Sequence, residues 1–153
     1  LTLSGNNTFS GGIFINGGSV SVTSNTHLGA STGGITLNGG RLTVSAANIS
    51  AARIVNVLAG GGSIAVNGNN NFTTSGKLTG SGTLTKANVS GAGDQTLNFN
   101  STDNDFTGTL VIDNSSTQGI NNIVSFSSLA DTESSGDIIF SRSGATATAN
   151  GRF

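Results

Sequence analysis

The chain has 153 residues, of which 8% are charged, and its formal net charge is -1. So weak a charge excludes attraction to nucleic acid or to an anionic membrane by electrostatic field alone, and the 34% of hydrophobic residues, gathered in short β-branched runs, exclude a disordered chain. There is no cysteine for a disulfide or a thiolate metal site, and no apolar run approaches the roughly 20 residues that would cross a bilayer, so we expect no membrane insertion.

Glycine and small polar residues make up most of the remaining chain. There are 24 glycines, and because Gly and Asn tolerate positive φ while Ser and Thr bond to nearby backbone, the composition favours short strands joined by tight turns. Proline is absent. Since proline removes a backbone donor, its absence fits a chain whose backbone is paired nearly everywhere.

Residues 11–22 begin the clearest internal repeat. Their sequence GGIFINGGSVSV returns as GGITLNGGRLTV at residues 33–44, an offset of 22 residues, and a weaker copy at the same offset ends at residues 62–68. Within the strands of each copy apolar and polar residues alternate, which is the pattern of a strand with one inward face. Each unit is therefore predicted to be a strand, an Asn-Gly-Gly turn, a second strand and a longer connection.

A second similarity spans a larger distance. Residues 1–16 match residues 97–113 with one inserted residue, and they share Asn-x-Phe-[Ser/Thr]-Gly-x-[Ile/Leu]-x-Ile-[Asn/Asp]. Chance similarity between low-complexity segments explains so long a match poorly. It indicates that one structural unit recurs along the chain.

These repeats predict an all-β fold, a right-handed parallel β-helix. Stacked coils need equivalent positions about 4.8 Å apart, which requires the same unit at a constant spacing. A sandwich of hairpins is the rival, because Asn16-Gly17 and Asn38-Gly39 are strong hairpin signals, but a sandwich requires no constant spacing. At this period the chain makes about seven coils, on the order of 33 Å long.

We expect a single domain over residues 1–153, with repeat units near 1–22, 23–44, 45–68 and 78–112 and a more irregular region over 113–153. Because the chain starts inside a strand-like pattern and without an initiator methionine, we expect it to be a fragment of a longer protein. The residues predicted to face inward are Leu1, Leu3, Phe9, Ile13, Ile15, Val20, Val22, Ile35, Leu37, Leu42, Val44, Ile64, Val66, Phe72, Leu84, Leu97, Phe99, Phe106, Leu110, Ile112, Phe126 and Phe140.

The second half of the chain carries a family resemblance. Residues 78–86 (LTGSGTLTK), the turn at residues 91–93 and residues 96–112 together resemble the passenger-associated transport repeat of autotransporters. Residues 1–22 look like the later two thirds of another copy, with Phe9 where the family usually has Tyr. The chain departs from the family by inserting residues 87–90 before the Gly-Ala-Gly turn and placing Asp94-Gln95 after it, which affects the local register.

The resemblance implies a passenger of type V secretion or a related large surface protein. Such passengers cross the outer membrane unfolded, through a β-barrel, and fold outside the cell. The expected location is therefore extracellular or on the bacterial cell surface. The family signature marks a structural repeat and does not mark an activity.

Few residues are candidates for chemistry. Asp103 and Asp105 form the best acidic pair, since two carboxylates at this spacing can hold Ca²⁺ or act as acid and base. No basic residue lies within the surrounding repeat, and both acids align with variable turn positions of the other copy, so we interpret them as a solvated turn. His27 is the only histidine, and we interpret it as a turn or surface residue.

The remaining polar clusters are also interpreted as turns. Asp131, Glu133 and Asp137 lie in a serine-rich segment that we expect to be a loop rather than a Ca²⁺ site. Residues 60–62 (GGG) lack the lysine of a phosphate loop. We therefore predict no catalytic residues, no cofactor and no metal, with Asp103 and Asp105 as the only metal candidates.

The function predicted from the sequence is mechanical and not enzymatic: a β-helix stalk of a secreted or surface-displayed, autotransporter-like protein. It includes a possible contribution to adhesion, with host or neighbouring-cell surface molecules as partners. The alternatives are a self-assembling extracellular fibre or surface-layer component, built by end-to-end pairing of exposed ladder edges, and a polysaccharide-acting β-helix enzyme.

Overall fold

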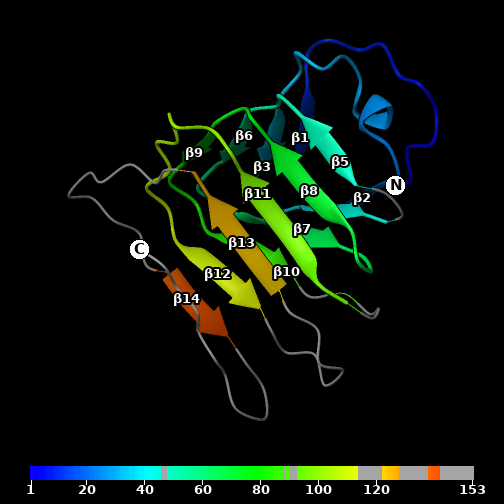
Figure 1. Ribbon diagram of the computed structural model, residues 1–153. Coiled ribbons are helices and arrows are strands. Elements are labelled where there is room, and N and C mark those ends of the chain that lie inside the picture. Colours follow the sequence, from blue (N-terminus) through cyan, green and yellow to red (C-terminus); the bar gives the residue numbers. More distant parts are fainter. Residues whose placement is uncertain (46–47, 88, 90–92, 114–121, 128–137, 142–153) are drawn as a thin grey trace.

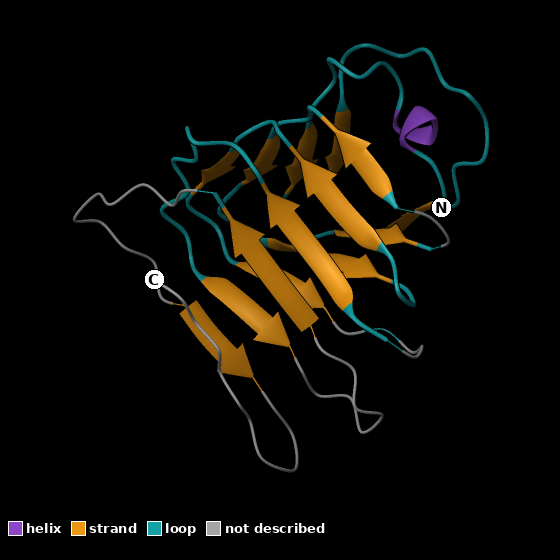
Figure 2. Ribbon diagram, viewed as in Figure 1, coloured by secondary structure: helices purple, strands orange, loops and turns teal. Residues whose placement is uncertain are grey.

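The fold is a stack of turns built from three parallel β-sheets (Figures 1 and 2), as seen in a computed structural model that describes residues 1–45, 48–87, 89, 93–113, 122–127 and 138–141. Sheet 1 contains β1 (Ile13–Ile15), β3 (Ile35–Leu37), β6 (Val55–Val57) and β9 (Leu78–Gly80). Sheet 2 contains β2 (Ser19–Val22), β4 (Arg41–Val44), β7 (Gly62–Val66), β10 (Leu84–Ala87), β12 (Leu110–Asp113) and β14 (Ile138–Ser141). Sheet 3 contains β5 (Ile49–Ala51), β8 (Asn71–Thr74), β11 (Gln95–Phe99) and β13 (Asn122–Phe126).

The predicted parallel solenoid is confirmed, with one correction to its repeating unit. The chain visits sheets 1, 2 and 3 in turn, so a complete turn has three strands and not the two that the Asn-Gly-Gly repeat suggested. The third strand lies in what the sequence marked only as a longer connection. In the first turn that place is taken by the 3-10 helix η1 (Asn25–Leu28), which Ser24 caps by accepting from the backbone N–H of Thr26.

The register of sheet 2 reproduces the sequence repeat. Val20 pairs with Leu42 and Leu42 pairs with Ile64, each step advancing 22 residues along the chain. Later turns are longer, since Leu84 pairs with Leu110, which is 26 residues on. The described residues therefore form about four turns, and the seven coils expected from a constant period are not confirmed.

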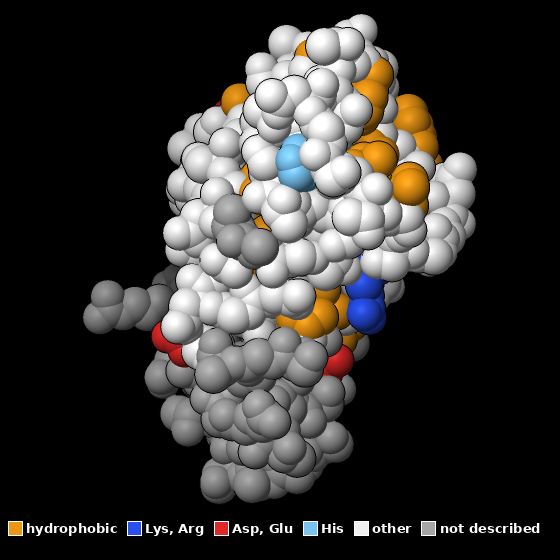
Figure 3. Space-filling view, turned by 90° about the vertical axis from the view of Figure 1, so that its right-hand side faces the viewer, with side chains coloured by type: hydrophobic (Ala, Val, Ile, Leu, Met, Phe, Trp, Pro, Cys, Tyr) orange, Lys and Arg blue, Asp and Glu red, His pale blue; other side chains and the backbone are white. Residues whose placement is uncertain are grey.

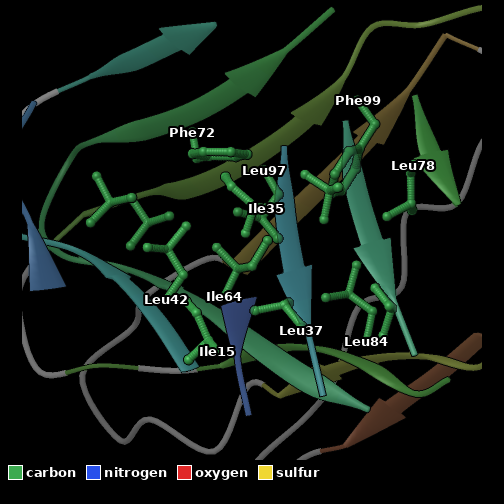
Figure 4. Packing of buried hydrophobic residues seen from close by; sticks show 14 of the residues in the cluster. Ile15, Ile35, Leu37, Leu42, Ile64, Phe72, Leu78, Leu84, Leu97 and Phe99 are labelled. Carbon is green, nitrogen blue, oxygen red and sulfur yellow. The ribbon is translucent and has the colours of Figure 1, made fainter. Parts of the chain in front are cut away.

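The core is a dry interior between the three sheets (Figure 4), made of aliphatic side chains with Phe72 and Phe99. Sheet 2 supplies Leu42, Ile64 and Leu84 to it, all with no exposed surface. Such a column buries apolar area at every turn, which is the dominant favourable term in folding.

Two predicted inward residues are in fact exposed. Leu1 is 79% exposed although its backbone extends sheet 2 through the bridge of Thr2 to Ser21, because its side chain has a neighbouring turn on one side only. Phe9 is 40% exposed, and its ring lies against Gly29 on the outside of the first turn. Phe106, its counterpart in the matched repeat, is only 8% exposed.

Several core residues escaped the sequence analysis. Val55, Val57 and Leu78 line the interior from sheet 1, Ile49 from sheet 3, and Leu28 from η1. Leu3, Ile13 and Phe126 were predicted to be core but are only partly buried. The predicted inward position of Phe140 lies on a side chain outside those described, and so does the segment 144–150.

Glycines permit close approach where one turn crosses the next. A Cβ on Gly82 would overlap the backbone carbonyl of Leu58, and a Cβ on Gly108 would overlap the carbonyl of Gly82. Gly17, at an open turn, has nothing near its missing Cβ. The glycines of the GSG segment are therefore steric requirements of stacking, not just flexible joints.

Candidate functional site

The predicted acidic pair lies on a turn beside sheet 1, and one of its acids has a cationic partner. Lys77 Nζ lies 2.7 Å from Asp105 Oδ2, and the two side chains are 37% and 51% exposed. This contact corrects the expectation that no basic residue is near. Lys77 is 28 residues away in the chain but lies in the preceding turn, so stacking brings it alongside Asp105. The hydrogen bond from Lys77 lowers the pKa of the Asp105 carboxyl.

The neighbouring residues hold this turn in shape. Asp103 accepts from its own backbone neighbourhood, with its N–H bonded to Ser101 Oγ at 3.1 Å and its Oδ1 accepting from Thr102 at 3.4 Å. Asn104 is 2% exposed, and its Oδ1 accepts from the backbone N–H of Leu78 at 2.7 Å, in the place of a ladder carbonyl. Asp103 and Asp105 therefore flank a structural asparagine.

This geometry gives the acidic pair little chemistry of its own. One carboxylate is ion-paired and half-exposed, whereas a general acid in a glycosidase needs a raised pKa. Within the described ranges, no group of three or more His, Asp or Glu side chains is placed to hold a metal ion. The acids Asp131, Glu133 and Asp137 lie outside the described residues.

His27 lies in η1 and serves local structure. Its Nδ1 accepts from the backbone N–H of Thr23 at 3.4 Å, and its backbone carbonyl accepts from Asn7 Nδ2 at 2.8 Å. The glycines at 60–62 line a shallow, open depression of about 510 Å³ with Arg41, Ser63, Thr83 and Thr85 at its sides. The depression gathers hydroxyls and one guanidinium without a nucleophile and base in contact.

Arg53 is the most extensively bonded side chain, and the sequence analysis missed it. It is 1% exposed, and burial lowers the pKa of its guanidinium. Nε donates to Asn25 Oδ1 at 2.7 Å, Nη1 donates to the carbonyls of Ala30 and Gly33 at 2.8 and 2.7 Å, and Nη2 donates to those of Asn25 and Gly29 at 3.1 and 2.8 Å.

All five N–H groups of this guanidinium are thereby used. They hold the loop around η1, which replaces a sheet 3 strand in the first turn and so lacks ladder partners of its own. The carbonyl of Arg53 in turn accepts from Thr74 Oγ1 at 2.5 Å, which extends the network into the next turn. Its sequence signal is a single charge inside the run AARIV of a charge-poor chain.

Lys86 is the second buried cation. It has no exposed surface, and burial lowers its pKa to about 8 against the opposing field of Asp113. Nζ donates to Asn122 Oδ1 at 2.6 Å, to the carbonyl of Ala87 at 3.1 Å and to Gln95 Oε1 at 3.4 Å. Its register alignment with Ile64 and Ile112 marks it as an inward position.

The outer face of sheet 1 carries exposed apolar side chains. Phe14 on β1 is 66% exposed, and Ile54 and Leu58, which flank β6, are 47% and 39% exposed. Figure 3 shows hydrophobic side chains along the right-hand edge of the upper half, the side on which sheet 1 lies. No helix in the described part of the chain is both long and apolar enough to span a membrane.

The fold and these contacts together define the class of protein as a parallel β-solenoid whose buried cations hold neighbouring turns together. Comparisons of the chain with models of protein families, with curated proteins and with solved structures found no match. The resemblance to autotransporter repeats thus stays a prediction from the sequence.

Proposed function

We propose that this chain is a structural β-helix stalk of a secreted or surface-displayed protein of the autotransporter kind. The observation that carries the proposal is the unbroken ladder of sheet 2, in which six strands from β2 to β14 pair in parallel. A ladder of this kind extends along one axis and spaces whatever is attached at its ends. The right-handed winding belongs to the proposal and rests on the general handedness of parallel crossovers.

The mechanism of such a stalk is its own folding. Each turn offers backbone groups and an apolar surface to the next, so that Leu42 and Ile64 are covered as the following turn forms. Folding that proceeds turn by turn outside the cell favours outward movement of the chain, because each added turn is harder to reverse. The two buried cations hold adjacent turns in one register.

An adhesive contribution is the second candidate. The exposed Phe14, Ile54 and Leu58 support it, because clustered apolar side chains on a surface are typical of contact sites. In this reading the partner is a host or neighbouring-cell surface molecule that contacts the outer face of sheet 1.

Surface labelling tests the proposed location. Antibodies raised against the purified chain are expected to label intact cells that carry the gene, and protease added outside is expected to remove the label. An antibody to a cytoplasmic protein, which labels only permeabilised cells, is the control. Labelling of the chain that appears only after permeabilisation contradicts the proposal.

A further inference from the structure

A lysine interrupts the apolar column of sheet 2. The register aligns Ile64 with Lys86 and Lys86 with Ile112, so Lys86 occupies an inward position between two aliphatic side chains. It has no exposed surface. A buried ammonium is costly unless it is paired and hydrogen-bonded, and the identity of its partners is therefore informative.

The closest partner of the amine is a side-chain amide. Lys86 Nζ lies 2.6 Å from Asn122 Oδ1, and Asn122 Nδ2 donates to the backbone carbonyl of Asp113 at 2.6 Å. Gln95 Oε1 is farther from the amine, at 3.4 Å, and Gln95 Nε2 donates to the carbonyl of Val89. The amide of Asn122 is thus held at both ends, with its carbonyl group against the amine.

An acid and a low dielectric complete the arrangement. Burial lowers the pKa of Lys86 to about 8, so a sizeable fraction of the amine is neutral and nucleophilic near neutral pH. Asp113 opposes this shift through its negative charge, which places its carboxylate within electrostatic reach of the amine. A positioned amine, amide and carboxylate away from water are the components of acyl transfer.

We propose that Lys86 and Asn122 join in an intramolecular isopeptide bond that links β10 of sheet 2 to β13 of sheet 3. The contact between Nζ and the held side-chain amide carries this inference.

The reaction needs no co-reactant. Neutral Nζ attacks Cγ of Asn122, and the Asp113 carboxylate accepts the proton that the nitrogen loses. That proton passes to Nδ2, the bond from Cγ to Nδ2 breaks, and ammonia leaves. The product is a secondary amide between Nζ and Cγ, and no atom is oxidised or reduced.

The direct test is mass spectrometry of the purified, folded chain. The expected mass is lower than the sequence mass by one ammonia, and protease digestion is expected to yield one branched peptide that contains Lys86 and Asn122. A succinimide at an Asn-Gly pair also loses ammonia, but it joins no two peptides, so the branched peptide decides. Absence of that peptide from the folded chain overturns the proposal.

Matched variants locate the bond. Lys86→Met and Asn122→Ala are expected to abolish the branched peptide, whereas Lys77→Met, which removes the exposed lysine paired with Asp105, is expected to retain it. Asp113→Asn keeps the amine and the amide and is expected to slow the reaction at least tenfold. A branched peptide that survives in Lys86→Met overturns the assignment.

The pH dependence of stability provides a second readout. The pKa of a free Lys86 would be about 8 in the folded chain and 10.5 in the unfolded chain, so the unfolded chain would bind more protons between these values. The free energy of unfolding would then rise as the pH rises from about 8 to about 10.5. An amide nitrogen does not titrate, so the linked chain is expected to match Lys86→Met over this range, and a rise present only in the unsubstituted chain contradicts the bond.

Discussion

Replacing Arg53 by methionine is expected to destabilise the chain by about 3–5 kcal/mol, the cost of removing one partner from a buried charged network. Methionine keeps much of the side-chain volume but donates no hydrogen bond. The carbonyls of Gly29, Ala30 and Gly33 would lose a donor inside the protein, where water does not replace it. Chemical denaturation followed by circular dichroism measures the effect.

The control for this variant is Arg41→Met. Arg41 is exposed and donates from Nε to Ser63 Oγ at 3.2 Å, so its loss is expected to change stability by about 0.5 kcal/mol or less. Arg53→Lys is expected to lie close to Arg53→Met, because one ammonium cannot reach five acceptors arranged around a planar guanidinium. Equal stability of the Arg53 and Arg41 variants would show that the network does not hold the first turn.

Phe72→Ala is expected to cost about 3–5 kcal/mol, whereas Phe14→Ala is expected to cost about 0.5 kcal/mol or less. Phe72 has no exposed surface and pairs in register with Ile49 and Leu97, so its ring fills the interior between two turns. Phe14 is 66% exposed on the outer face of sheet 1. The two substitutions remove the same atoms and differ only in the face of the sheet.

Thermal and denaturant unfolding of the two alanine variants measures this difference. The pair tests which face of each strand is inward, since a shift of one residue in register exchanges the two faces. A larger loss in Phe14→Ala than in Phe72→Ala would contradict the register described above.

The sequence predicted the parts of the fold that repeat with recognisable residues. Gly-Gly-Ile-x-[Ile/Leu]-Asn-Gly-Gly recurs at the first two strands of each turn, and its offset is the register of sheet 2. Sheet 3 was missed because β5, β8 and β11 share no such residues, and their pairing advances by 23 residues at Ile49 and by 25 at Phe72. An irregular step dilutes a periodic signal, although the backbone ladder tolerates it.

The polar contacts were harder to predict for a different reason. Lys77 meets Asp105 only because the turn there is longer than 22 residues, and this length is apparent only once the strands are paired. Arg53 bonds mostly to backbone carbonyls, which carry no residue-specific signal. Lys86 was predictable in principle, since it has the same strand parity as Leu84, but a lysine in the core contradicts the usual rule that charges face water.

Pulling single molecules of the chain from its two ends tests the stalk most directly. Turn-by-turn stacking predicts a series of unfolding steps, each releasing one turn of 22–28 residues, or roughly 70–100 Å of extended chain. Steps of this size that recur at similar forces support a repeating mechanical element. Extension at forces no higher than those that stretch an unfolded chain would contradict the proposed function.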